Sequence, residues 1–217
     1  PPSPLVFYGR NGDFNWEGSE FRVDGGGVAA VTVITGSESS LATSLADSIQ
    51  TSQLNCFEGQ GDPPYIMDRS GDYRSHPDLS RIFTGRFWKQ FRDNLPRFSD
   101  DHCSTNLGIH FLEGGSRIDE PCSGVIVVSG DVQIQGEALI QGIVIHLGDG
   151  RLEIRERALV EGGIWVTAAR ASDEDLVLED LAFTLADQAQ IRFDPVQIAG
   201  ASACFPITLL DWRILFP

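Results

Sequence analysis

The side chains best suited to ligand chemistry are concentrated in one stretch, residues 69–97. This stretch holds seven of the sixteen cationic residues against three acidic ones, a net charge of +4 that leaves −19 for the rest of the chain. Basic side chains pair with phosphates and an indole ring stacks on bases. The pattern predicts a face for single-stranded nucleic acid or another polyanion on a helix over about 77–94. The candidate binding residues are Arg81, Arg86, Trp88, Lys89 and Arg92.

A second interpretation of the same stretch needs no ligand. The arginines would then pair with the acidic remainder of the chain and keep an amphipathic helix soluble. Both interpretations stay open at this point.

Four cysteines, Cys56, Cys103, Cys122 and Cys204, are the other reactive group. They show no C-x-x-C spacing, so the sequence indicates no zinc site. An even number permits two disulfides, and the pair Cys103–Cys122 closes the shorter loop, which leaves Cys56 for Cys204. Two bridges would place the protein in an oxidising compartment; four reduced thiols in a cytoplasmic protein are the alternative.

The sequence carries no G-x-S-x-G, H-E-x-x-H, P-loop or dinucleotide fingerprint. The acidic runs 99–102 and 172–175 lack the alternating order of a calcium loop and are interpreted as solvated turns. His110 and His146 sit within strand-like alternation and are interpreted as structural. We therefore expect no catalytic residue, metal or cofactor.

Composition indicates an ordered globular protein: 217 residues, 41% hydrophobic, with a net charge of −15. The acidity disfavours general binding of nucleic acid or anionic membrane, except where cations cluster. There is no apolar run of eighteen residues and no secretory pattern. Because the sequence opens Pro-Pro-Ser-Pro without an initiator Met, we expect a trimmed or mature fragment.

The elements that would position these groups follow a repeat in the second half of the chain. Shifted by twenty positions, ALIQG at 138–142 overlies ALVEG at 158–162. Glycine and β-branched residues at this density favour strands over helix, and a twenty-residue unit with three short strands indicates one coil of a β-solenoid. Equivalent residues would then stack, with Ile134 beside Ile154 in the interior. An ordinary β-sandwich is the alternative.

Outside the coils the same register predicts polar and charged pairs. Gln133 would lie beside Glu153, and opposite charges would meet in two further pairs. The two charge pairs are Asp131 with Arg151 and Glu137 with Arg157.

The first half of the chain predicts short strands, including Val31–Ile34, and one helix over Leu41–Gln53 before the basic helix. The expected fold is mainly β with two helices. The expected regions are an α+β strand-helix-helix cap over 1–105, a β-solenoid of about twenty residues per coil over 106–200, and a C-terminal strand or cap over 201–217.

The Gly-bounded stretch VIVVSGDVQIQG…GIVIHLGDGRLEI…GGIWV resembles the coils of large minor pilins of the PilX-like group, including ComZ-like competence pilins. Upstream, WEGSEFRVDG, a strand, a helix, GQGDPP and a second helix come in the same order as in that group. The resemblance implies the head of a type IV pilus protein at the cell surface, anchored in the membrane before assembly. It implies other pilins as partners and a role in tip assembly, adhesion or DNA uptake. It also implies an apolar N-terminal helix, which this sequence lacks.

We therefore expect a non-enzymatic structural and interaction module. One alternative is an extracellular polysaccharide-acting β-helix enzyme, which would need cations and carboxylates gathered along one strand face. The predicted exterior rows stack no two carboxylates. The other alternative is a bactofilin-like polymer joined through open coil edges, but such a rod would be coil almost throughout.

Overall fold

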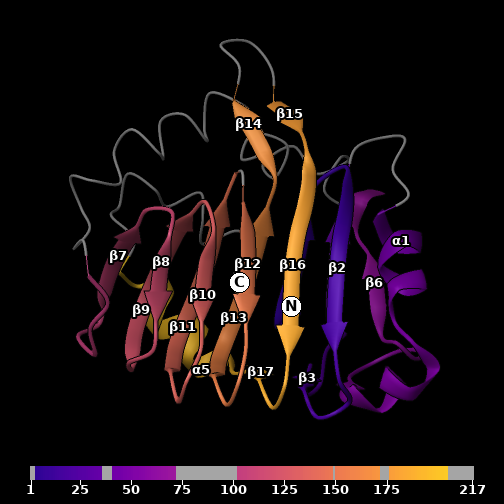
Figure 1. Ribbon diagram of the computed structural model, residues 1–217, viewed down its shortest axis with the longest axis horizontal. Coiled ribbons are helices and arrows are strands. Elements are labelled where there is room, and N and C mark those ends of the chain that lie inside the picture. The colour runs from indigo at the N-terminus through magenta and orange to yellow at the C-terminus, as the bar shows by residue number, and fades with distance from the viewer. Residues whose placement is uncertain (1–2, 36–40, 72–101, 149, 172–175, 205–217) are drawn as a thin grey trace.

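The computed structural model describes residues 3–35, 41–71, 102–148, 150–171 and 176–204. Within these residues the protein is mainly β, with three helices and parallel, curled sheets (Figure 1). Ten strands form one sheet, here called sheet A, and five form a second, sheet B. A further two strands make a small antiparallel pair. Strand pairs described within sheets A and B are parallel, which excludes an antiparallel sandwich for this part of the chain.

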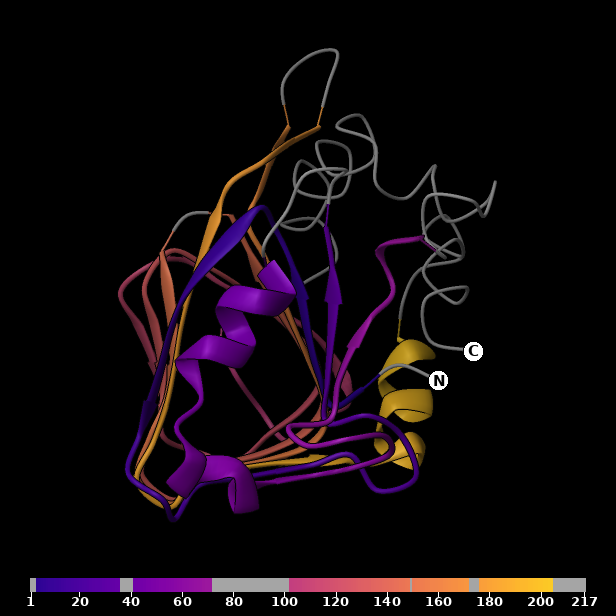
Figure 2. The same cartoon turned by 90° about the vertical axis from the view of Figure 1, so that its right-hand side faces the viewer.

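Sheets A and B form successive windings that share one interior (Figure 2). The windings of the repeat are built from β7 (Gly108–Leu112), β8 (Ser116–Ile118), β9 (Cys122–Ser129), β10 (Val132–Ile134), β11 (Leu139–Leu147), β12 (Arg151–Ile154) and β13 (Leu159–Thr167). Within the repeat, β8, β10 and β12 are the short strands of sheet B, and β9, β11 and β13 are the longer strands of sheet A.

The predicted twenty-residue stacking is confirmed. Ile134 on β10 pairs with Ile154 on β12, and Ile140 on β11 pairs with Val160 on β13. All four side chains are buried in the core. Apolar side chains from successive windings therefore form columns, and each column removes several apolar groups from water at once.

Strands β16 (Asp180–Ala186) and β17 (Gln190–Phe193), followed by strands from the first half of the chain, continue the same stack. Sheet B gains β16 and then β2 (Asn11–Glu17), and sheet A gains β17, β1 (Leu5–Tyr8), β3 (Arg22–Asp24), β4 (Val31–Ile34), β5 (Phe57–Glu58) and β6 (Ile66–Asp68). The first part of β13 pairs with β17, and its second part pairs with β1. Strand β1 therefore lies beside the second part of β13, in the position that a longer β17 would otherwise fill. The boundary expected near residue 105 is not a boundary between the two sheets, because each sheet contains strands from both sides of it.

A hairpin interrupts the stack between β13 and β16. Strands β14 (Ala169–Ala171) and β15 (Leu176–Leu178) pair antiparallel and project beyond the windings (Figures 1 and 2). This antiparallel pair lies within 106–200, where coils of the predicted β-solenoid were expected, so that expectation is wrong for these two strands.

Two helical segments cover the β5–β6 end of the stack (Figure 2). Helix α1 (Leu41–Ser48) buries Leu41 and Leu45, and the 3-10 helix η1 (Thr51–Cys56) follows it. The indole of Trp16 donates to Ser48 Oγ (2.8 Å), and Gln53 Nε2 donates to the Trp16 carbonyl (2.6 Å). The predicted helix over 41–53 is confirmed in its first part, but it changes to 3-10 geometry in its second.

Helix α5 (Pro195–Ser202) was not predicted, because the coil period was extended to residue 200. Its N-cap Asp194 accepts from the backbone N–H groups of Val196 and Gln197, and Pro195 suits the first helical turn. The helix packs outside sheet A against β9, β11 and β13. The Asp-Pro pair was the available sequence signal. No helix among the described residues is long and apolar enough to cross a membrane.

Aromatic side chains fill the interior at the windings made by β1, β2, β3 and β16. The rings of Phe7 and Phe14 lie 4.7 Å apart, and those of Trp16 and Phe57 lie 5.1 Å apart, both edge to face. Edge-to-face pairs add a modest gain to their burial. The repeat windings use Val, Ile and Leu at the corresponding positions, so the two halves of the chain fill one interior with different side chains.

A column of glycines fixes one corner of the windings. Gly108, Gly124, Gly142 and Gly162 lie in register on β7, β9, β11 and β13. Gly142 has φ +144°, and a β-carbon added there would lie 2.0 Å from the carbonyl oxygen of Gly124. A Cβ does not fit at that distance, so backbone lies directly against backbone at this corner.

We expect Gly142→Ala to lower the free energy of unfolding by at least about 3 kcal/mol, because it adds backbone strain and a clash with the neighbouring winding. Gly148→Ala separates the two effects. Gly148 also has positive φ, +78°, but a β-carbon there meets open space, so a loss of only about 1–2 kcal/mol is expected.

The control is Gly200→Ala in α5, where a β-carbon also meets nothing and the expected change is about 0.5–1 kcal/mol of stabilisation. Urea unfolding of the three variants measures the differences. Equal losses at Gly142 and Gly148 would contradict the proposed corner contact.

Candidate functional site

The face predicted to bind nucleic acid lies outside the described residues. Arg81, Arg86, Trp88, Lys89 and Arg92 all fall within 72–101, so this site stays a prediction. Among the described residues, an extended polar surface lies on the outer face of sheet B.

The outer face of sheet B follows directly from strand alternation. In β10 and β12 the flanking apolar residues point inward, which turns Gln133 and Glu153 outward. An open groove of about 490 Å³ runs over β8, β10 and β12. Its lining residues are Gly115, Ser116, Arg117, Asp131, Val132, Gln133, Arg151 and Glu153.

Hydrogen bonds link the outer side chains from one winding to the next. Gln133 Nε2 donates to Glu153 Oε2 (3.0 Å), as expected from the register. Arg155 Nε donates to the same carboxylate oxygen (3.0 Å), and its Nη1 donates to Glu17 Oε2 (2.8 Å). The hydrogen bond with Glu17 is the main cause that raises the pKa of Arg155. Arg155 thus ties β12 to β2, although Glu17 lies 138 residues earlier in the sequence.

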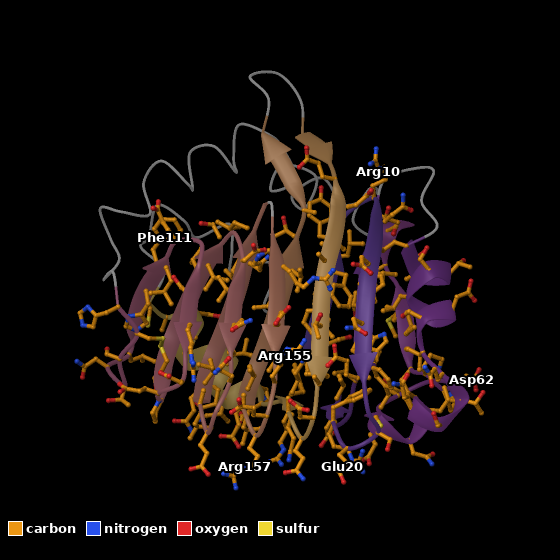
Figure 3. The ribbon with its side chains drawn as sticks, viewed as in Figure 1. Arg10, Glu20, Asp62, Phe111, Arg155 and Arg157 are labelled. Atoms are coloured by element: carbon orange, nitrogen blue, oxygen red, sulfur yellow. A yellow bond between two sulfur atoms is a disulfide. The ribbon has the colours of Figure 1, made fainter. Side chains whose placement is uncertain are left out.

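The strand between β12 and β2 makes these long contacts possible. Strand β16 places Ala182 between Arg151 and Asp13. Since alanine is short, the Arg151 guanidinium passes over β16, where it donates to Thr184 Oγ1 (3.0 Å) and forms an ion pair with Asp13. Figure 3 shows Arg155 in the middle of this face and Arg157 at its lower edge.

The two predicted charge pairs have different outcomes. Arg157 and Glu137 form an ion pair (2.5 Å), as predicted. Asp131 does contact Arg151, but its carboxylate accepts from the backbone N–H (2.9 Å), while the guanidinium turns to Asp13. The prediction missed the competitor because Asp13 belongs to the first half of the chain, which was not expected beside β16.

The face offers an ordered array of donors and acceptors that are largely engaged with one another. Glu153 accepts from two side chains and Arg155 donates to two carboxylates. Such an array can present fixed hydrogen-bonding groups to a polar ligand. The described residues hold no group of three His, Cys, Asp or Glu that could bind a metal ion.

One of the two predicted disulfides is confirmed. Cys103 and Cys122 form a bridge with a Cα–Cα distance of 5.4 Å at the end of the stack where β9 begins. Cys56 and Cys204 are free, so the second predicted bridge is wrong. Cys56 lies in the core at the end of η1, where its thiol donates to the Ser19 carbonyl, whereas Cys204 follows α5 outside sheet A. The sheet separates them, and burial raises the pKa of both thiols.

Two buried histidines line the interior near the bridged end of the stack. His146 is 1% exposed, and its Nε2 lies 2.8 Å from the Gly130 carbonyl. His110 is fully buried, and its Nε2 lies 3.0 Å from the Ser123 carbonyl. The sequence indicated structural histidines at these positions, but alternation alone did not show that each would contact a carbonyl near a corner of the stack.

No protein family, curated protein or solved structure matches this chain. The resemblance to minor pilins therefore stays an expectation, and the geometry above is the basis for a functional proposal.

We expect two free thiols per molecule when the protein is denatured without reductant, and four after reduction. Alkylation followed by peptide mapping should label Cys56 and Cys204 and recover Cys103 and Cys122 in one linked pair of peptides. Four thiols before reduction would contradict the bridge and, with it, the oxidising compartment.

We also expect Arg155 to contribute more to stability than Arg157, because its side chain is 31% exposed against 67% and contacts two carboxylates. A double-mutant cycle of Arg155→Ala with Glu17→Ala should give a coupling of about 1 kcal/mol. The matched cycle of Arg157→Ala with Glu137→Ala should give about 0–0.5 kcal/mol. Equal couplings would show that the contact across β16 is worth no more than an exposed ion pair.

Proposed function

We propose that the protein is a non-enzymatic structural and interaction module, the exposed head of a type IV pilus-associated minor pilin of the PilX-like or ComZ-like kind. The observation that carries this proposal is the parallel register of the windings. Gly124 pairs with Gly142 and Gly142 pairs with Gly162, offsets of 18 and 20 residues, as expected for coils of a β-solenoid. We propose that fold for the stack as a whole.

The disulfide supports the proposed location. A bridge between Cys103 and Cys122 is compatible with an extracellular or otherwise oxidising compartment. The head of a pilus protein works in such a compartment. Pilus association itself rests on the resemblance of the coil stretch and of the upstream elements.

The covered end of the stack favours a finite body over a bactofilin-like polymer. Helix α1 and the 3-10 helix η1 bury Leu41, Leu45 and Cys56 against the last windings. An end-to-end polymer needs strand edges at both ends. A module with one covered end is better suited to stand as a terminal head.

One observation favours the enzymatic alternative, a polysaccharide-acting β-helix. The groove on sheet B gathers Asp131 and Glu153 with Arg117 and Arg151. A general base, however, needs a carboxylate oxygen directed at the substrate. Glu153 instead accepts from Gln133 and Arg155, and Asp131 accepts from the Arg151 backbone, so both carboxylates already have structural partners.

The proposed ligand contact is DNA during uptake or a surface ligand. For DNA, the candidates are the basic residues Arg81, Arg86, Lys89 and Arg92 with Trp88. The acidic remainder of the chain would repel DNA elsewhere, which would restrict contact to that stretch.

Deletion of the gene in its native host tests the proposal. We expect fewer surface pili by electron microscopy or a loss of adhesion or transformation, restored by the full-length gene. Complementation with Arg81→Ala/Lys89→Ala/Arg92→Ala tests the DNA role, because pili should then return while transformation does not. Arg157→Ala, which removes an exposed arginine at the edge of sheet B, is the matched control and should restore both.

Unchanged piliation, adhesion and transformation in the deletion strain would overturn the pilus proposal. Release of reducing sugar from a polysaccharide by the purified protein, abolished by Glu153→Gln, would instead support the enzymatic alternative.

A further inference from the structure

An ionisable ring occupies one position in an otherwise apolar column. His146 on β11 lies in register with Val128 on β9 and Val166 on β13, and Val166 pairs in turn with Phe7 on β1. These three neighbours belong to the buried core. The register therefore places the imidazole inside the windings, where valine would be expected.

The hydrogen bond of His146 fixes which nitrogen carries the proton. Its Nε2 lies 2.8 Å from the carbonyl oxygen of Gly130, and a carbonyl can only accept, so Nε2 is the donor. Its Nδ1 is then the bare acceptor, and it has no hydrogen-bond partner among the described residues. A second proton would have to sit on Nδ1, as a charged N–H group without an acceptor, in a buried position.

The Gly130 carbonyl is part of the turn that joins β9 to β10. Gly130 has φ +75°, and Gly150 of the next winding approaches it so closely that a β-carbon on Gly150 would lie 2.3 Å from the Gly130 carbonyl carbon. His146 thus satisfies a carbonyl at a tightly packed turn. Losing that hydrogen bond would leave a backbone acceptor unpaired.

The groups packed around the ring are almost all neutral. Strand β9 contributes Val128 and Ser129, and strand β13 contributes Val166 and Thr167. The inward residues of β10 and β12 across the interior are apolar: Val132, Ile134, Leu152 and Ile154. Burial is the largest effect on His146 and lowers its pKa, while the hydrogen bond to the Gly130 carbonyl and the charge of Asp131 act in the opposite direction.

We propose that neutral His146 is a pH-sensitive latch that holds the β9–β10 turn closed, and that its protonation opens the windings at the bridged end of the stack. His110 on β7, with β9 between it and β11, has a similar arrangement: its Nε2 lies 3.0 Å from the Ser123 carbonyl and 3.3 Å from the Asn106 carbonyl, and its Nδ1 has no hydrogen-bond partner among the described residues. The proposal does not depend on the pilus assignment.

The direction of the pH effect follows from proton linkage. In an opened, hydrated state His146 has an ordinary pKa of about 6.5, above its value in the closed state. Opening therefore takes up a proton once the pH falls below about 6.5. From there down to the closed-state pKa, the opening equilibrium constant should rise by up to about tenfold per pH unit, because one proton is involved.

Amide hydrogen exchange of the whole chain between pH 5 and 7.5, corrected for the intrinsic pH dependence of exchange, measures this opening. Peptides from β9–β11 should become less protected as the pH falls, while peptides from β2–β4 should change much less. His146→Gln keeps a neutral donor and should lose at least half of the pH-dependent rise. His102→Gln, which changes an exposed histidine, should behave as the wild type does.

An unchanged pH dependence in His146→Gln would overturn the proposal, and so would an equal rise at β2–β4 in the wild type. If His146→Gln does not fold, His146→Val decides the question, since it matches Val128 and Val166 in the column. That variant should be less stable because the Gly130 carbonyl loses its donor, yet its stability should depend less on pH than that of the wild type over the same range.

Discussion

The close approach of backbone to backbone at the glycine corner is the constraint on which the rest of the structure depends. Gly124, Gly142 and Gly162 lie so near one another that side chains are excluded there. This contact sets the corner and therefore the register of each winding on the next. A shift of one residue would turn every inward side chain outward, so both the apolar columns and the outer polar rows depend on it.

The polar side chains on the outer face of sheet B help to determine the order of the strands. The apolar interior alone would allow more than one order. Many apolar side chains could fill the interior in more than one order, but Arg151 reaches Asp13 and Arg155 reaches Glu17 only if β16 and β2 follow β12. Ala182 permits the Arg151 contact by being small. Exposed ion pairs contribute little free energy each, so their role here is to favour one order of strands over others.

The sequence was sufficient for the features that depend on local pattern. The twenty-residue repeat, the contact of Gln133 with Glu153, the start of the helix at Leu41 and the Cys103–Cys122 bridge all follow from spacing and alternation. It was not sufficient for contacts between distant segments. Strand β1 pairs with β13, and Arg151 pairs with Asp13. Both contacts depend on which distant strands become neighbours, and the periodicity of the sequence does not encode this. The same holds for the free thiols, since Cys56 and Cys204 lie on opposite sides of a sheet whose path the sequence did not reveal.

The position of β1 beside β13 and β4 affects the order in which the protein can be made. A ribosome synthesises β1 more than 150 residues before β13, so β1 can pair early with β4 but lacks its other neighbour until β13 has been made. Windings β7 to β13 pair with near neighbours in sequence and can assemble as they appear, whereas closing β1 into place spans a long loop and is intrinsically slow. Until then the edge of β1 that will face β13 stays unpaired, and a nascent chain in this state would benefit from a chaperone that shields the β1–β4 pair.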